Sequence, residues 1–260
     1  MAIITGAARG IGAATARRLA SEGWQLILVD RCADDPALGY GLATRAELDA
    51  VVDACGGASH ALGIIADVRD QGGLDRAVAD GVARFGGLDA ALAVAGVIAG
   101  GATAWTTADD VWDVMLGVNL DGVRRLARAA VPALLQRPAP RRGRFVAVSS
   151  AGGTLGLPLL AAYSAAKHGV VGFIRSLASE LGPEGITANA VAPGSTDTAM
   201  LAASAEVYGL ADVDEFAVHH QLARLVQPEE VAALLAWLCS EQSSAITGAV
   251  LPVDAGMTAS

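Results

Sequence analysis

Apolar and polar positions follow one another along the chain in a pattern that predicts strands and helices in alternation. Short apolar runs bounded by glycine, proline or acidic residues indicate buried strands, and segments with apolar residues every three to four positions indicate amphipathic helices. The expected strands span residues 2–5, 25–30, 61–67, 88–94, 144–149, 187–192 and 249–253. The expected helices span residues 13–22, 71–85, 108–132, 160–181 and 231–239.

This order of elements predicts an α/β fold. Repeated strand–helix–strand units give a mainly parallel, doubly wound sheet with helices on both faces. The strands are continuous apolar runs, as expected for strands that are buried on both sides. No break in composition marks a second domain, so we expect one domain over residues 1–260. Ligands of such sheets bind at the carboxyl ends of the strands.

Composition and charge narrow the class of protein. Hydrophobic residues make up 53% of the chain and aromatic residues only 4%, which predicts a large aliphatic core. The net charge of −9 and the lack of a Lys/Arg-rich stripe argue against nucleic-acid binding. The mean hydropathy is +0.46, yet no apolar run approaches the ~18 residues of a membrane helix. We therefore expect no membrane association, and apolar surface buried between subunits.

The N-terminus and the cysteines indicate a cytoplasmic protein. The first ten residues, MAIITGAARG, have neither the charged segment nor the cleavage site of a secretory signal. The three cysteines, Cys32, Cys55 and Cys239, are widely spaced and show neither a disulfide framework nor metal-ligand spacing. A reducing compartment is therefore expected, and no metal site.

A glycine-rich turn connects the first strand to the first helix, in the sequence TGAARGIG from residue 5 to residue 12. Glycine lets the backbone approach a pyrophosphate closely, and the helix N-terminus presents free N–H groups and a positive dipole end. The alternative is a tight turn without a ligand. The strand–turn–helix context favours a dinucleotide site, for which the expected contacts are Gly6, Arg9, Gly10, Ile11 and Gly12.

Acidic residues end the second and third strands. A carboxylate at Asp30 can accept hydrogen bonds from the adenosine ribose and repels a 2′-phosphate, so it favours NAD over NADP. Arg9 and Arg31 oppose this preference because either can reach a phosphate, but we expect the carboxylate to dominate. Asp67 and the adjoining Val68 are expected beside the adenine. The alternative for both acids is that they only cap a turn or loop.

Tyr163 and Lys167 lie four positions apart and share one face of an expected helix. A lysine there stabilises a phenolate and is predicted to lower the pKa of Tyr163, so that the phenol exchanges a proton with a substrate oxygen. Ser150 can hydrogen-bond the same oxygen, and Asn119 can hold a water that links Lys167 to solvent. Taken alone, the Tyr–Lys spacing also fits a solvated helix face.

A proline–glycine turn follows the sixth strand, in the sequence PGSTDT from residue 193 to residue 198. A rigid turn followed by hydroxyl groups can hold the carboxamide of a nicotinamide. The alternative is an ordinary turn. The expected contacts are Pro193, Gly194, Thr196 and Thr198.

Together these motifs have the order and spacing of the short-chain dehydrogenase/reductase family, which the chain resembles over nearly its whole length. The resemblance implies a Rossmann fold with a Ser–Tyr–Lys centre and a supporting asparagine. By this analogy Tyr163 is the general acid/base, Ser150 orients the substrate, and Lys167 binds the nicotinamide ribose and lowers the pKa of Tyr163. Asn119 completes the catalytic set. The family also implies a homotetramer formed through the two long helices and the C-terminal strand region.

The chain departs from the family pattern after the fourth strand. The family usually has Asn-Asn-Ala-Gly there, whereas this sequence has Ala93-Val94-Ala95-Gly96. The usual asparagine supports the sheet, so its loss is expected to change the local bonding more than the catalysis. Ala95 and Gly96 remain expected cofactor contacts.

A second departure is an insertion over residues 31–57, where most family members have a shorter link. Thr44 followed by Glu47 has the spacing of a capping box, which indicates a helix. The insertion resembles that of the mycofactocin-associated, carveol dehydrogenase-like branch, whose members are thought to hold NAD without free exchange. An insertion beside the adenosine end can cover the cofactor. The alternative is a surface helix without function.

Residues 196–222 occupy the place of a mobile substrate lid in this family. Their apolar side chains, with those of residues 97–98 and 155–160, predict an apolar pocket for a hydrophobic secondary alcohol or ketone. His219 and His220 can contact a substrate, but we expect them to be exposed lid residues because loops lie mostly at the surface. They lack a third partner for a metal.

The leading hypothesis is therefore an NAD-dependent alcohol dehydrogenase or ketone reductase. A 3-oxoacyl-[acyl-carrier-protein] reductase is the alternative within enzymes. Its acidic partner would require a basic surface, and NADPH preference is opposed by Asp30. The only basic cluster is Arg124, Arg125 and Arg128. The other alternative is a catalytically silent binding protein of the same fold, against which the intact Ser–Tyr–Lys set argues.

Overall fold

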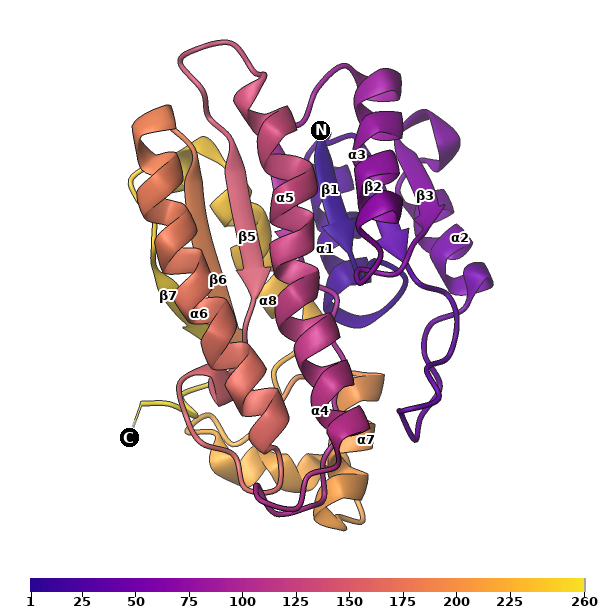
Figure 1. The fold of residues 1–260 in the computed structure, drawn as a ribbon, viewed down its shortest axis with the longest axis vertical. Coiled ribbons are helices and arrows are strands. Elements are labelled where there is room, and N and C mark those ends of the chain that lie inside the picture. Colours follow the sequence, from indigo (N-terminus) through magenta and orange to yellow (C-terminus); the bar gives the residue numbers. More distant parts are fainter. Residues whose placement is uncertain (260) are drawn as a thin grey trace.

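Seven parallel strands form a single sheet in the order β3-β2-β1-β4-β5-β6-β7 (Figure 1). The structure is a computed structural model and describes residues 1–259. The chain winds outward from β1 to β3 and then returns to place β4 beside β1, which opens a crevice between the two halves of the sheet. The strands are β1 Ala2–Thr5, β2 Leu26–Asp30, β3 Ala61–Ile65, β4 Ala90–Ala93, β5 Arg144–Val148, β6 Thr187–Pro193 and β7 Val250–Val253.

Helices cover both faces of this sheet. α3, α5 and α6 lie over one face (Figure 1), and α1, α2 and α8 lie over the other. The helices are α1 Gly10–Ser21, α2 Arg45–Ala54, α3 Gln71–Phe85, α4 Asp109–Leu116, α5 Gly122–Leu135, α6 Ala161–Leu181, α7 Ala199–Tyr208 and α8 Pro228–Cys239. The predicted doubly wound α/β architecture of a single Rossmann-like domain is confirmed.

The core consists of small and aliphatic side chains that point alternately to the two faces of the sheet. Ile3 and Ile27 pack beneath α3 and α5, whereas the next residues, Ile4 and Leu28, pack beneath α1 and α8. All four are fully buried. This alternation follows from the two-residue period of a strand and explains why the strands are apolar throughout.

The predicted helix over residues 108–132 is interrupted at the point where it reaches the site. α4 ends at Leu116, a five-residue π-helical segment runs over Gly117–Asp121, and α5 continues to Leu135. A π-helical segment changes the direction of its side chains relative to the flanking α-helix. Asn119 lies in this segment and is fully buried.

The insertion and the lid both contain helical segments. The insertion contains α2, whose first turn carries the predicted capping box between Thr44 and Glu47. The lid segment contains α7 and a 3₁₀-helical segment over Val213–His219. Within residues 1–259, every helix is too short or too polar to span a bilayer.

Threonine and asparagine side chains support the segment after β4, where the family asparagine is missing. The Thr5 hydroxyl oxygen accepts hydrogen bonds from the backbone N–H groups of Val94 (3.2 Å) and Ala95 (3.3 Å). Further along, Asn119 Oδ1 accepts from Val97 N at 3.1 Å. These two side chains therefore supply acceptors to the segment after β4 from β1 and from the π-helical segment, and the effect of the missing asparagine stays a prediction.

Replacing Thr5 by valine tests this support. Thr5→Val keeps the side-chain volume but leaves two N–H groups of the β4 segment without their acceptor, so we expect the free energy of unfolding to fall by about 1–3 kcal/mol. Urea titration followed by circular dichroism measures the change. Thr187→Val is the matched control, since that β6 hydroxyl forms no hydrogen bond among residues 1–259. Equal stability of the two variants would contradict the proposed support.

Candidate functional site

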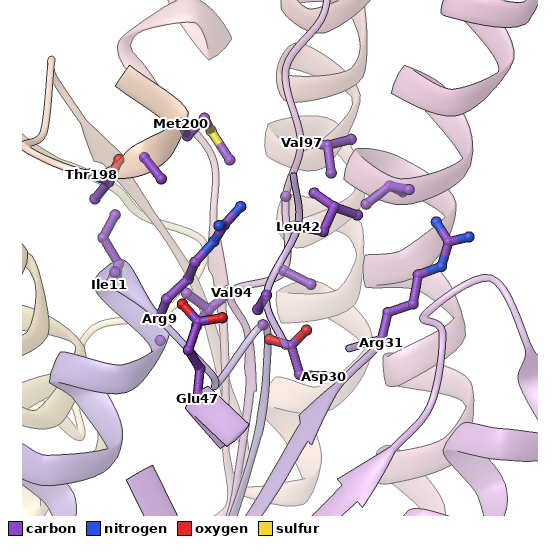
Figure 2. Close-up of a pocket in the computed structure, with 18 of the residues that line it drawn as sticks. Arg9, Ile11, Asp30, Arg31, Leu42, Glu47, Val94, Val97, Thr198 and Met200 are labelled. Carbon is purple, nitrogen blue, oxygen red and sulfur yellow. The ribbon is translucent and has the colours of Figure 1, made fainter. Parts of the chain in front are cut away.

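Two cavities meet at the carboxyl edge of the sheet. The first, here called the strand-end cavity, has a volume of about 530 Å³ and lies beyond β1 to β4 (Figure 2). The second, the lid cavity, has a volume of about 640 Å³ and lies between β5, β6, the start of α6 and the lid. The cavities share part of their lining, so a long ligand can extend from one into the other; the shared residues are Ile11, Val94, Gly96, Thr198 and Met200.

The glycine-rich turn packs so closely that side chains cannot be added to it. A Cβ atom on Gly12 would lie 1.9 Å from the carbonyl oxygen of Gly6. Gly6 has a φ of 68°, and a Cβ there would lie 2.6 Å from Ala95 Cα. α1 begins at Gly10 without a side-chain cap, so the N–H groups of its first turn remain available to a ligand in the strand-end cavity. This arrangement fits a pyrophosphate.

Asp30 lies at the rim of the strand-end cavity, as the sequence predicted (Figure 2). Its Oδ2 accepts a hydrogen bond from Ala8 N at 3.0 Å, and its Oδ1 accepts a longer one from Cys32 N at 3.4 Å. The carboxylate therefore caps the glycine turn. It also keeps free lone pairs that can accept from a diol.

Arg31 belongs to a compact network of two arginines and two aspartates. Its Nη1 lies 2.5 Å from Asp35 Oδ2, and its Nε lies 3.3 Å from Asp67 Oδ2. Arg69 Nη2 contacts the same two carboxylates at 2.8 and 2.7 Å. Burial acts to raise the pKa of Asp67, but hydrogen bonds and charge from the arginines outweigh it and hold that pKa below its ordinary value. The positive charge of Arg31 is thus compensated, and the predicted contacts Asp67 and Val68 line the cavity.

The insertion forms a wall of the strand-end cavity, to which Leu42 and Glu47 contribute (Figure 2). Tyr40 lines the same cavity. Two hydrogen bonds fasten the insertion across the cavity. Arg9 Nη2 donates to the carbonyl oxygen of Gly41 at 2.9 Å, and the Tyr40 hydroxyl accepts from Ile98 N at 2.9 Å. The insertion therefore borders the strand-end cavity, and its function there stays a prediction. Sequence analysis did not identify Tyr40, Asp35 or Arg69, although the i, i+4 spacing of Arg31 and Asp35 is a detectable signal.

Tyr163 and Lys167 lie on the face of α6 that borders the lid cavity. Both are buried, with exposed fractions of 7% and 3%. Lys167 Nζ donates to the carbonyl oxygen of Val148 at 2.9 Å and lies 5.7 Å from the centroid of the Tyr163 ring. Ser150 follows β5 directly, lines the same cavity, and accepts a hydrogen bond from Gly152 N at 3.1 Å. Three of the four predicted catalytic side chains, Ser150, Tyr163 and Lys167, therefore line one cavity, whereas Asn119 lines neither cavity.

The pKa shifts of this pair differ in part from the prediction. Burial raises the pKa of Tyr163, and the opposing effect of the Ser150 hydroxyl is smaller. Burial also lowers the pKa of Lys167 to about 8. The predicted lowering of the Tyr163 pKa is therefore wrong for the chain alone, because desolvation dominates and the ammonium group is bonded to Val148. A lysine with a pKa of about 8 still carries its proton at neutral pH, so its positive charge remains beside the phenol.

Asn119 has both N–H groups and one oxygen lone pair of its side-chain amide engaged. Its Nδ2 donates to the carbonyl oxygens of Val97 and Met115, both at 3.0 Å, and its Oδ1 accepts from Val97 N. Gly96 allows Asn119 and Lys167 to lie close together, since a Cβ on Gly96 would be 3.1 Å from Asn119 Oδ1 and 3.5 Å from Lys167 Nζ. Only Oδ1 keeps a free lone pair for the predicted water.

The turn after β6 lies between the two cavities. Pro193, Gly194 and Thr196 line the lid cavity, and Thr198 lines both. The turn is paired with the segment before α8, because Asp197 N donates to Val226 O (2.9 Å) and Val226 N donates to Ser195 O (3.0 Å). All four residues predicted from this motif therefore line one or both cavities.

The lid cavity is mainly apolar. On its outer side the Tyr208 hydroxyl donates to Pro158 O at 2.9 Å, and the Tyr208 ring packs edge-on against Phe216 at 6.0 Å between centroids. The hydrogen bond holds the lid against the loop before α6, and the ring contact lies within the lid. The other apolar lining side chains include Ile98, Leu157, Leu160, Leu201 and Met257.

The two histidines of the lid have different environments. His219 is exposed and lines the lid cavity, whereas His220 is buried, with an exposed fraction of 4%. The prediction that both are exposed is therefore wrong for His220, because the turn after it folds its imidazole inward against Gly194. Among residues 1–259, no cluster of three or more His, Cys, Asp or Glu side chains is arranged to hold a metal ion.

Comparison with known proteins places this site in a family. The family model described as Enoyl-(Acyl carrier protein) reductase matches residues 6–258. An uncharacterized oxidoreductase of Mycobacterium tuberculosis is 39% identical, with 98% of this chain and 95% of the relative covered. The (−)-trans-carveol dehydrogenase of Rhodococcus erythropolis is 38% identical, with 99% of this chain and 97% of the relative covered.

A solved structure agrees with these relatives. The crystal structure of carveol dehydrogenase from Mycobacterium avium in complex with NAD superposes with a TM-score of 0.93 at 34% identity, over 100% of this chain and 97% of that one. The similarity extends over both cavities and includes the segments that carry the Ser–Tyr–Lys set. The chain belongs to the short-chain dehydrogenase/reductase family of oxidoreductases.

Proposed function

We propose that this chain is an NAD-dependent dehydrogenase or reductase that acts on a hydrophobic secondary alcohol or ketone. The observation that carries the proposal is the position of Tyr163 and Lys167. They form a buried pair beside the junction of a cavity shaped for a dinucleotide and a mainly apolar cavity. A substrate there can exchange a hydride with a nicotinamide in the first cavity and a proton with Tyr163 in the second.

The residues of the strand-end cavity fit NAD. The glycine turn leaves room that any Cβ would fill, and the N-terminus of α1 favours a pyrophosphate. Asp30 would hold the adenosine ribose and repel a 2′-phosphate. Arg31 does not offset this repulsion, because Asp35 and Asp67 already neutralise its charge. Relatives whose names or structures specify NAD support the same cofactor.

The side chains of the lid cavity supply the proton chemistry. When bound, the nicotinamide accepts or supplies the hydride. Ser150 orients the substrate oxygen, and the Tyr163 phenol donates a proton to it during ketone reduction or accepts one during alcohol oxidation. Burial keeps Tyr163 protonated in the resting chain, which suits donation. For the reverse direction, the Lys167 ammonium stabilises the phenolate, and its N–H groups not bonded to Val148 can hold the ribose.

An acyl-carrier-protein reductase is the second candidate, favoured by the description of the matching family model. Such an enzyme docks an acidic partner beside its substrate channel and needs basic residues there. The arginine cluster of α5 does not fulfil this role, since none of its members lines the lid cavity; these residues are Arg124, Arg125 and Arg128. The apolar lid cavity therefore favours a small hydrophobic substrate.

We also propose that the insertion retains NAD and that a separate redox carrier, mycofactocin, reoxidises or reduces the bound cofactor. The support is the closure of residues 31–57 over the strand-end cavity by the bonds from Arg9 to Gly41 and from Ile98 to Tyr40. The salt bridges of Arg69 with Asp35 and Asp67 connect the beginning of the insertion to the segment that follows β3. Similarity to carveol dehydrogenases is consistent with this proposal.

A cytoplasmic homotetramer remains part of the proposal. An apolar composition and a largely exposed Trp105, at 84%, support the burial of further surface between subunits. Trp112 on α4 is also exposed, at 37%, and lies at the start of the long helical segment that the family uses for assembly.

Removing the phenolic hydroxyl tests the proton step. Tyr163→Phe should lower kcat for oxidation of cyclic secondary alcohols by at least ~100-fold, because the substrate oxygen loses its acid/base partner. NAD content, measured after denaturing the purified protein, should stay the same. Retained turnover in this variant would show that another group moves the proton.

Neutralising Asp30 tests cofactor choice. Asp30→Asn keeps an acceptor for the Ala8 N–H but removes the negative charge. We expect the ratio of NADP affinity to NAD affinity to rise about ten- to a hundredfold, as measured by calorimetry on protein freed of nucleotide. Asp53→Asn, on the exposed end of α2, is the matched control. An unchanged ratio would mean that another residue discriminates at the ribose.

Loosening the insertion tests cofactor retention. Tyr40→Phe keeps the ring but removes the acceptor for the Ile98 N–H. We expect NAD to dissociate about tenfold faster from this variant, measured as the nucleotide left after timed gel filtration. Tyr208→Phe removes a comparable bond from the lid and should leave NAD dissociation unchanged. Wild-type protein that purifies without NAD and turns over readily with added NAD would exclude retention.

A further inference from the structure

His220 is a buried, titratable side chain that the proton mechanism does not use. It follows the 3₁₀-helical segment Val213–His219 and has an exposed fraction of 4%. Its imidazole lies between the turn after β6 and the segment that leads into α8. A Cβ on Gly194 would lie 3.0 Å from His220 Nε2 and 2.9 Å from Asp254 Cα, so only glycine lets the imidazole and the C-terminal segment approach the turn together.

Both ring nitrogens of His220 have backbone partners that fix which nitrogen carries the hydrogen. Nδ1 lies 2.5 Å from the carbonyl oxygen of Arg224, which can only accept, so Nδ1 must carry the hydrogen. Nε2 lies 3.2 Å from the backbone N–H of Ser195, which can only donate, so Nε2 must be the acceptor. The two contacts agree on a single neutral tautomer.

The backbone turn after His220 places the Arg224 carbonyl oxygen beside Nδ1 of the imidazole. Ala223 N donates to His220 O at 2.9 Å and closes a tight turn in which Ala223 takes a left-handed φ of 51°. This conformation is unfavourable for alanine and persists only where its surroundings impose it. It directs the Arg224 carbonyl oxygen at Nδ1. Beside it, Leu222 N donates to Ala255 O at 3.1 Å, which ties the turn to the C-terminal segment.

The turn after β6 is held by several bonds. Gly194 N donates to Val253 O at 3.1 Å, and Asp197 N and Ser195 O pair with Val226. Among residues 1–259, Ser195 N donates to the imidazole of His220 and to no other acceptor. The held segment carries Thr196 and Thr198, which line the cavities where the nicotinamide end of the cofactor would lie.

We propose that His220 is a positioning residue for hydride transfer: by accepting the Ser195 N–H, it fixes residues 193–198 against the nicotinamide and couples this turn to the lid. This inference rests on the proposed function, because the turn positions a nicotinamide only if NAD is the cofactor. The bond to Arg224 serves to orient the ring, and the bond from Ser195 transmits the positioning.

Two amide substitutions at His220 test the bond from Ser195 N and the bond to Arg224 O separately. In His220→Gln the side-chain oxygen reaches the position of Nε2 and can accept from Ser195 N, whereas in His220→Asn the shorter amide can reach only the Arg224 carbonyl. His220→Ala removes both bonds. His60→Gln, at an exposed histidine beside β3, is the control for the substitution itself. Thermal unfolding establishes that each variant is folded.

The first measurement is amide hydrogen exchange of residues 193–198 in the purified proteins at matched NAD content. We expect His220→Asn and His220→Ala to exchange this segment about tenfold faster than the wild type, since an N–H without its acceptor is freed. His220→Gln and His60→Gln should stay within about threefold of the wild type. The second measurement is steady-state turnover. There kcat should fall about tenfold in the Asn and Ala variants while KM for the alcohol changes less than threefold.

Three results would overturn the inference. If the exchange rate of residues 193–198 and kcat in His220→Ala equal those of the wild type, the turn does not depend on the imidazole. Equal loss in the Gln, Asn and Ala variants would show that the imidazole acts by packing. If kcat falls and exchange rises in His220→Gln but not in His220→Asn, the bond to the Arg224 carbonyl carries the role. Failure of the proposed function is distinguishable, because the wild type itself would then neither bind NAD nor oxidise alcohols, whatever the exchange data showed.

Discussion

The close contact between the ends of β1 and β4 determines where everything else in the site can lie. Thr5 accepts from the N–H groups of Val94 and Ala95, and Gly6 approaches Ala95 too closely for any side chain. This seam, the contact of Thr5 and Gly6 with Val94 and Ala95, joins two halves of the sheet. One half carries the glycine turn and Asp30, and the other half lies next to Ser150 and Tyr163. The two cavities share Val94 and Gly96 because they open on either side of it. A dinucleotide that follows the edge of the sheet must cross the seam to reach Tyr163.

Much of this organisation could be predicted from the sequence because local signals agreed with the fold. Apolar strands and helices that end at glycine indicated the doubly wound sheet. The glycine-rich turn before α1 indicated that the backbone there approaches another segment or a ligand closely. The spacing of Tyr163 and Lys167 was informative because a helix places i and i+4 on one face. The structure then brought Ser150 to the same cavity, since strand ends converge at one edge of a parallel sheet.

The features that sequence analysis missed depend on contacts between distant segments. Tyr40 is unremarkable in sequence, yet its hydroxyl meets Ile98, 58 positions away. Arg69 pairs with Asp35 across 34 positions. His220 was expected to be exposed because loops usually are, but a left-handed Ala223 turns its ring inward. The Tyr163 pKa was also mispredicted, because helix spacing shows that Lys167 is near but not that both groups are desolvated or that Val148 binds the ammonium.

We propose that this chain holds NAD beside the apolar lid cavity and that Tyr163 exchanges the proton that accompanies hydride transfer there. The most direct measurement is a single turnover of the purified, NAD-containing protein with a cyclic secondary alcohol deuterated at the carbinol carbon. We expect deuterium to appear on the nicotinamide of the protein-bound cofactor, detected by mass spectrometry, in the wild type but not in Tyr163→Phe. Deuterium transfer at the same rate in both proteins, or no transfer from any such alcohol to bound NAD in the wild type, would contradict it.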